Sequence, residues 1–236
     1  MNIPFDNLIG LAKGPLVEFR PNVWLHQDCL SSFNQLKEEA EKNGYDIQIV
    51  SSFRSFYRQK EIWQMKALGE KTLLDKRGNP LDFKQLKPQD IVEAILRWSA
   101  FPGASRHHWG CDFDVIDGNA IADPNYQIQL TPSEVEAGGV FADFHQWLDE
   151  IIPYDLSFGF FRPYDEDLGG VSPEKWHLSY APLSQNYQKS FTFEVFKKLL
   201  EINELKDLAY LEIIKEKKED IFERFIQNTT PAPQSL

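Results

Sequence analysis

The sequence is poor in cysteine and in positive charge. Its 236 residues include two cysteines, Cys29 and Cys111, too few for the disulfide framework of a small secreted domain. Two buried thiols are the simpler interpretation, and a Cys29–Cys111 bridge is the alternative. The 25 Lys and Arg residues against 36 Asp and Glu give a net charge of -11, whereas a nucleic-acid surface needs clustered cations. The composition therefore argues against a disulfide scaffold and against a nucleic-acid partner.

Long apolar runs are also missing. No stretch approaches the ~18 apolar residues that identify a membrane-spanning helix. The first residues, Met-Asn-Ile-Pro-Phe-Asp, lack the basic region and apolar core of an export signal. We therefore expect a soluble chain without a membrane span. Its expected location is the cytoplasm, or the periplasm or cell wall if a signal has been removed.

Apolar and aromatic residues, at 42% and 14%, suffice to bury one sizeable core. Helical and strand patterns are mixed along the chain, which predicts an α+β fold with a small antiparallel sheet flanked by helices. We place the domain at residues 1–189 with its core at 44–182, a helical extension at 190–228 and a disordered tail at 229–236. The predicted helices are 32–43, 55–68, 90–98 and 141–151. The predicted strands are 46–51, 111–115, 158–161 and 176–180. An exposed excursion is predicted at 69–88.

The stretch Ser105-Arg-His-His-Trp-Gly-Cys-Asp-Phe-Asp114 combines an imidazole with two carboxylates. Carboxylates alternate with apolar residues at its end, so on a strand Asp112 and Asp114 share one face. Gly110 allows the backbone to turn and to place His107 over that face. The alternative is that these are exposed strand carboxylates and loop histidines, since short His/Asp matches are common.

A second stretch, Glu174-Lys-Trp-His177, supplies another imidazole and a carboxylate. On an ideal strand, residues three apart point to opposite faces, so a bend after Pro173 is required to bring Glu174 and His177 together. Two histidines, one aspartate and a spare glutamate are typical of a zinc hydrolase, in which a carboxylate outside the ligand set takes a proton from water. The alternative makes Glu174 a surface carboxylate and His177 a strand histidine, with Trp176 in the core.

The pattern Ser-x-His-x-x-Gly-x-x-x-Asp, followed by Glu-x-Trp-His, resembles the D-alanyl-D-alanine carboxypeptidase and dipeptidase group of zinc peptidases. That group shares its metal-site architecture with lysostaphin-type enzymes and the hedgehog signalling domain. The resemblance implies one Zn²⁺ per chain, held by His107, Asp114 and His177, with Glu174 as the catalytic base. Asp112 departs from the pattern, because the broader family often has a small residue there.

An upstream block, Ser52-Phe-Arg-Ser-Phe-Tyr-Arg-Gln59, also resembles this group. The resemblance implies that Arg54 contacts the substrate carbonyl or carboxylate, and a guanidinium there would stabilise negative charge growing on oxygen. Ser105 either holds the substrate or caps the loop of His107. Gln59 either supports Arg54 and the substrate or faces solvent. His108 and Trp109 are expected at the rim of the cleft.

The resemblance implies a peptidoglycan stem peptide as substrate and hydrolysis next to D-alanine, by a D,D- or L,D-carboxypeptidase. One alternative is an endopeptidase that cuts cross-links, which an open cleft without a carboxylate pocket would favour. Another is a non-catalytic, zinc-stabilised binding module of the hedgehog kind. Glu174 distinguishes this module from an enzyme, because a module without catalysis needs no base.

Overall fold

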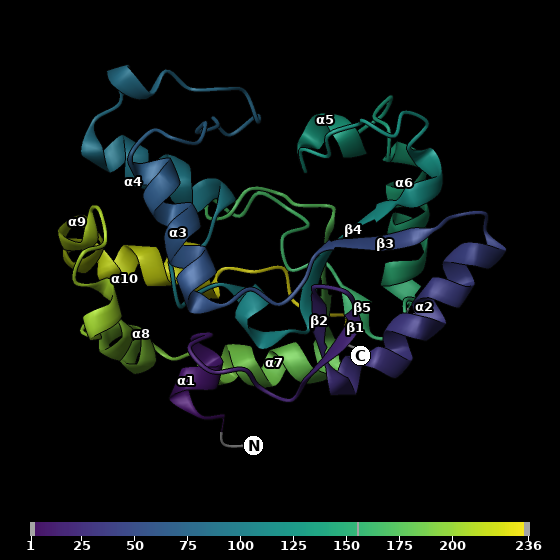
Figure 1. The fold of residues 1–236 in the computed structure, drawn as a ribbon, viewed down its shortest axis with the longest axis horizontal. Helices are drawn as coiled ribbons and strands as arrows, with labels where there is room; N and C mark the ends of the chain where they lie inside the picture. The colour runs from purple at the N-terminus through teal and green to yellow at the C-terminus, as the bar shows by residue number, and fades with distance from the viewer. Residues whose placement is uncertain (1–2, 155, 234–236) are drawn as a thin grey trace.

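The computed structural model describes residues 3–154 and 156–233, and it confirms the predicted α+β class. Figure 1 shows a central sheet with helices on both sides. The strands are β1 (Leu16–Arg20), β2 (Val23–His26), β3 (Ile47–Ser51), β4 (Asp112–Asp117), β5 (Phe160–Phe161) and β6 (His177–Tyr180). The α-helices are α1 (Phe5–Leu8), α2 (Leu30–Lys42), α3 (Phe56–Ala67), α4 (Pro88–Trp98), α5 (Pro132–Val135), α6 (Ala142–Ile151), α7 (Ala181–Ser190), α8 (Phe193–Leu199), α9 (Leu211–Glu216) and α10 (Lys218–Ile221).

The main sheet is antiparallel, with the strand order β3-β4-β6-β5. Its register decides which side chains meet. Asp114 on β4 is paired with His177 on β6, whereas Asp112 is paired with Ser179. Directly opposed residues on neighbouring strands bring their side chains together on one face. The pairing therefore places a carboxylate beside an imidazole in the middle of the sheet.

The opposite face of the sheet is apolar. Phe113 and Val115, which alternate with the two aspartates, are fully buried in a cluster with Phe33 of α2 and Phe144 of α6. Figure 1 shows α2 and α6 on the same side of the molecule as β3. The alternation of carboxylates and apolar residues along β4 thus separates a packed core from a polar face, as predicted.

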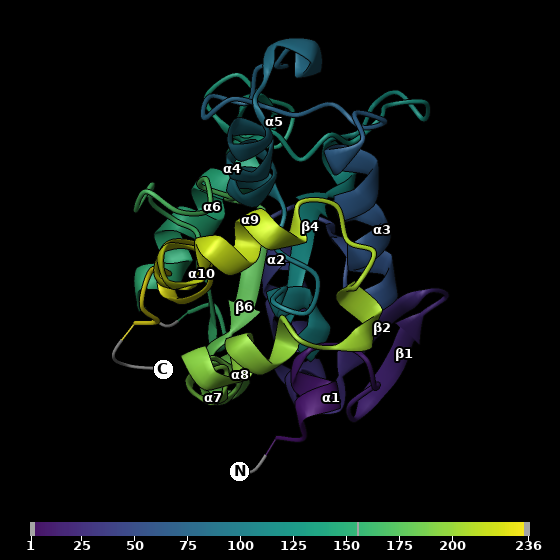
Figure 2. The same cartoon turned by 90° about the vertical axis from the view of Figure 1, so that its left-hand side faces the viewer.

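The C-terminal helices pack on the same core as α3 and α4. Phe196 and Ile214 are buried in one cluster with Trp63 and Ile95, and the Trp63 indole donates to the carbonyl oxygen of Ala209 at 3.0 Å. Figure 2 views the molecule from that side and shows α8, α9 and α10 in front of the strands. The C-terminal helices therefore share one core with the rest of the described chain.

Several boundaries differ from the predicted ones for local reasons. Helix α2 begins at Leu30, and the hydroxyl of Ser32, the predicted start, instead donates to the Tyr180 hydroxyl. Helix α4 begins at Pro88, because proline suits the first helical turn and the Asp90 carboxylate accepts from the backbone N–H of Lys87. The hairpin β1–β2 was not predicted.

The excursion at 69–88 contains a short 3-10 helix (Phe83–Gln85) and one bridge between Leu74 and Pro80. Within the predicted tail, residues 229–233 form no helix or strand, and the Thr230 N–H donates to the carbonyl oxygen of Pro163. Residues 234–236 lie outside the described part of the chain. No helix in the described residues has the length and apolar character needed to cross a bilayer.

Candidate metal centre and active site

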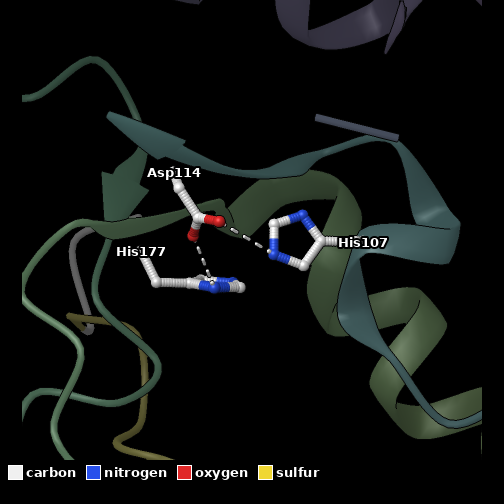
Figure 3. A group of neighbouring side chains, drawn as sticks. All are labelled: His107, Asp114 and His177. Carbon is white, nitrogen blue, oxygen red and sulfur yellow. Dashed lines mark ion pairs between the residues drawn. The ribbon is translucent and has the colours of Figure 1, made fainter. Parts of the chain in front are cut away.

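Three side chains from separate elements meet on the polar face of the sheet. His107 lies on a 3-10 helix (Arg106–Trp109), Asp114 on β4, and His177 begins β6. Gly110 ends the 3-10 helix with a φ of 73°, a left-handed conformation that favours glycine, and this turn brings His107 back over the strand. One ligand atom from each of the three residues lies within 4.8 Å of the others. Figure 3 shows both imidazoles beside the Asp114 carboxylate.

The His107 imidazole is oriented by the backbone. Its Nδ1 lies 3.1 Å from the carbonyl oxygen of Ser52, so Nδ1 carries the proton and donates it. Nε2 is left 3.5 Å from Oδ2 of Asp114. Burial lowers the pKa of His107 to about 3, which keeps the ring neutral, as a metal ligand must be.

His177 is held from the other side. Its Nε2 lies 3.1 Å from Oδ1 of Asp112, whereas its Nδ1 lies 3.3 Å from Oδ1 of Asp114. Burial lowers the pKa of His177, but the carboxylates of Asp112, Asp114 and Glu174 outweigh burial and raise it well above its ordinary value. The three carboxylates around His177 favour positive charge at this position. A metal ion bound to the imidazole can supply that charge in place of the added proton.

The donor atoms fit a divalent metal. His177 Nδ1 and Asp114 Oδ1 are both buried and have no hydrogen-bond partner within the described residues. Unsatisfied buried polar atoms are rare and need a partner. Burial raises the pKa of Asp114, but His107, His177 and Arg54 outweigh burial and lower it to about 2, so the carboxylate is charged. Two imidazole nitrogens and one carboxylate form a donor set that suits catalytic zinc.

The structure distinguishes the two aspartates by their contacts. Asp112 is fully buried, and its Oδ1 accepts from Nε of Arg106 at 2.7 Å as well as facing His177. Arg106 is itself fixed by Ser179 Oγ at 2.8 Å and by Gln188 Oε1 at 2.6 Å. Asp112 is therefore placed to orient His177, and Asp114 is the candidate ligand.

Replacement of Asp112 by asparagine should weaken zinc binding. Asparagine keeps an oxygen near His177 but removes the charge that orients the ring, and loss of such a supporting partner typically costs about 10- to 100-fold in metal affinity. Competition with a chromogenic chelator measures this affinity. Asp117→Asn, at the other end of β4, is the control, because Asp117 accepts from backbone N–H groups of Asp46 and Asn119. Equal zinc affinity in both variants would contradict the role of Asp112.

Glu174 lies next to the three candidate ligands. Its Oε2 is 3.6 Å from His177 Nδ1, and its side chain is mostly buried. The required bend is present, since the His177 N–H donates to the carbonyl oxygen of Glu174 at 3.0 Å, and the Glu174 N–H donates to Tyr164 at 2.8 Å. Burial raises the pKa of Glu174. The carboxylate is thus placed to accept a proton beside the metal position.

Arg54 follows β3 and precedes α3. Its guanidinium donates to Gln59 Oε1 at 2.8 Å and to Ser51 Oγ at 2.9 Å, and its backbone N–H donates to the carbonyl oxygen of His107 at 3.1 Å. The Ser55 hydroxyl caps α3 by accepting from the backbone N–H of Arg58. Gln59 is fully buried, and its amide also donates to the carbonyl oxygen of Ala100 at 2.7 Å. We therefore assign Gln59 to positioning Arg54 rather than to contact with a substrate.

These groups open into one cavity of about 280 Å³. Ser105 lines it, and the Ser105 side chain makes no capping hydrogen bond, so the capping alternative is wrong. Trp176, predicted as plain core, is buried and also lines the cavity. The residues that line the cavity and that sequence patterns did not identify include Lys66, Lys71, Arg106 and Tyr164.

Two expected rim residues are buried instead. His108 Nε2 accepts from the N–H of Gly103 at 3.1 Å, and burial lowers the pKa of His108 to about 4. Trp109 stacks on Tyr187, with ring centroids 5.4 Å apart. His145 is fully buried and packs beside Phe144. Cys29 and Cys111 are free and buried.

Comparison with known proteins shows where the chain belongs. A family model described as VanY, D-alanyl-D-alanine carboxypeptidase, matches residues 22–183. Two uncharacterised proteins of Haemophilus influenzae strain Rd are similar: one is 43% identical over 104 residues, covering 42% of this chain and 71% of its own length. The other is 36% identical over 94 residues, covering 39% and 69%.

A solved structure, described as VanYB in complex with D-Alanine-D-Alanine, has a similar fold. The TM-score is 0.50 at 23% identity, and the match covers 78% of this chain and 87% of that one. At this identity the likeness concerns the fold. The family match itself spans all three candidate ligands and Glu174. This chain belongs to the VanY family of peptidases, described as D-alanyl-D-alanine carboxypeptidases.

Proposed function

We propose that the protein is a zinc-dependent carboxypeptidase that hydrolyses a peptide bond next to D-alanine in peptidoglycan stem peptides. The observation that carries this proposal is the arrangement of four groups in one cavity. His107, Asp114 and His177 form a ligand set with unsatisfied buried donor atoms, and Glu174 stands beside that set. Membership in the VanY family supports the choice of substrate.

A zinc ion held by His107, Asp114 and His177 would supply a Lewis acid that polarises the carbonyl and acidifies a water molecule. Glu174 takes the proton as the water oxygen forms its bond to the carbonyl carbon. When the carbon–nitrogen bond then breaks, Glu174 returns that proton to the leaving amine nitrogen. Its pKa, raised by burial, suits both steps, because a stronger base accepts the proton more readily and its acid form can still donate it.

Arg54 stabilises the negative charge that develops on the carbonyl oxygen. Its side chain lines the cavity, and its contacts with Gln59 and Ser51 fix the guanidinium before substrate binds. A fixed donor aimed at developing charge needs no reorganisation during the reaction. Arg54 thus stabilises the oxyanion, and Glu174 accepts and returns the proton in the same reaction.

The rival functions make different demands on the cavity. A binding module of the hedgehog kind needs no carboxylate beside its metal. In such a module the mostly buried Glu174 carboxylate would lower folding stability and would serve no catalytic step. An endopeptidase needs no cationic pocket for a free carboxylate. The lysines that line this cavity favour a carboxypeptidase.

Mass spectrometry of products from defined tetrapeptide and pentapeptide stems tests the proposal. The protein should remove one C-terminal residue with zinc present and none after addition of a chelator. Cleavage of the pentapeptide indicates D,D-specificity, and cleavage of the tetrapeptide indicates L,D-specificity. Cleavage of cross-linked dimers alone would favour the endopeptidase, and no zinc-dependent cleavage of any peptide would contradict the proposal.

A further inference from the structure

Four cationic side chains line the cavity of the candidate site, and Arg54, Lys66 and Lys71 are the three other than Arg106. Lys66 lies on the last turn of α3, and Lys71 follows in the excursion. Within the described residues, none of the three has a carboxylate within the 4.0 Å of an ion pair. The cations on the outer surface of α3 differ, because Arg58 is paired with Glu61 and Lys60 with Asp207.

The Lys66 ammonium is largely withdrawn from solvent. Burial lowers its pKa to about 8, and the nearby charge of Glu174 only partly opposes this effect. A cation removed from water is costly unless an anion pairs with it. Because no carboxylate among the described residues lies within ion-pair distance of the Lys66 ammonium, an anionic group of a ligand could pair with it.

The charges around the cavity do not balance. Arg106 is neutralised by Asp112 at 2.7 Å, which leaves Arg54, Lys66 and Lys71 against the carboxylates of Asp114 and Glu174. A divalent cation in the ligand set would increase the positive excess. The cavity therefore attracts anions, although the chain as a whole has a net charge of -11.

Arg54 and Lys66 occupy different parts of this cavity. Arg54 precedes the N-terminal end of α3, whereas Lys66 lies ten residues after Phe56, its first residue, which at about 1.5 Å per residue is roughly 15 Å further along the helix axis. The two cations therefore reach the cavity from opposite ends of α3, so an extended peptide, at about 3.5 Å per residue, can contact Arg54 and Lys66 with different groups.

We propose that Lys66, with Lys71 beside it, forms a subsite for a substrate carboxylate, separate from the position of Arg54 at the reacting carbonyl. The inference rests on the proposed function, because a peptide must lie in this cavity. The carboxylate is either the terminal one of the residue to be released or an acidic group on the acyl side. Both present the same chemistry to an ammonium group.

Three stem peptides separate these sources. The first has all its carboxylates, the second has a C-terminal amide, and the third has its acyl-side carboxylates amidated. Wild type, Lys66→Met and Lys66→Arg are compared for kcat and KM. Lys84→Met is the control, because Lys84 lies in the same excursion but not in the cavity lining. Calorimetry with the zinc-loaded Glu174→Gln variant, with and without Lys66→Met, measures peptide binding without turnover.

Lys66→Met should raise KM for the first peptide by roughly 10- to 100-fold, with kcat little changed. Wild type should bind the first peptide more tightly than one of the two amidated peptides, and Lys66→Met should remove that difference. The position of the amide in that peptide identifies the carboxylate that Lys66 binds. Lys66→Arg should restore most of the affinity, and Lys84→Met should behave like wild type. Unchanged discrimination against both amides in Lys66→Met would overturn the subsite. Carboxylate-dependent binding without hydrolysis by wild type would instead overturn the proposed function and retain the subsite.

Discussion

Glu174→Gln should abolish hydrolysis while about one zinc stays bound per chain. Glutamine has the same shape but cannot accept the proton of the attacking water, and loss of a general base typically costs about 10²- to 10⁴-fold in rate. The ligand set of His107, Asp114 and His177 is untouched. Turnover of a stem peptide and zinc content by mass spectrometry are measured on the same sample.

The matched control for this variant is Glu166→Gln. Glu166 is exposed in the loop between β5 and β6, so its replacement makes the same chemical change outside the cavity. This control should keep wild-type turnover. Normal turnover in Glu174→Gln would remove Glu174 as the base, and loss of zinc from it would show that Glu174 is a ligand.

His177→Ala should lose zinc as well as activity. Three protein ligands are the usual minimum for catalytic zinc, and the variant keeps two. It also leaves Asp112, Asp114 and Glu174 without the imidazole that lies among them, so their mutual repulsion is no longer offset. Chelator competition should show zinc affinity reduced below the measurable range.

His145→Ala distinguishes ligand loss from general destabilisation. His145 is as deeply buried as His177, but it lies against Arg162 and Phe144, away from the candidate ligands. This control is expected to lose stability and to keep zinc. If His177→Ala retained wild-type zinc occupancy, the ligand assignment would be wrong.

Much of the candidate site was predictable from sequence, because its residues sit in short patterns with strict geometric consequences. Alternation along Cys111–Val115 predicted one polar and one apolar face, and β4 has both. The spacing of Glu174 and His177 predicted a bend, and a turn joins them. Such patterns are local, so one sequence suffices to interpret them.

The choice between Asp112 and Asp114 could not be made from their shared face. It depends on the register of β4 with β6, which places Asp114 opposite His177, and on Arg106, which neutralises Asp112. Register is a long-range property that a strand pattern does not determine. Asp112 itself was the available signal, because a buried carboxylate on a strand requires a cation.

Lys66 and the hairpin β1–β2 were missed for different reasons. Lys66 lines the cavity because α3 packs along the cavity wall. The spacing of residues in the sequence does not show where a helix packs. The hairpin did have a signal, because Pro21-Asn22 separates two runs of strand-forming residues and Asn22 adopts a φ of 65°. The C-terminal helices likewise share one core with α3 and α4, a contact between distant segments.

The pairing of Asp114 with His177 couples metal binding to the integrity of the sheet. The two residues face each other across strands that are far apart in the sequence, and β4 and β6 are hydrogen-bonded in the middle of the sheet. A slip of one residue in this register would turn one donor to the opposite face. A bound ion would therefore favour this alignment of the two strands over slipped ones, so that the stability of the strand pair would rise with the concentration of free metal.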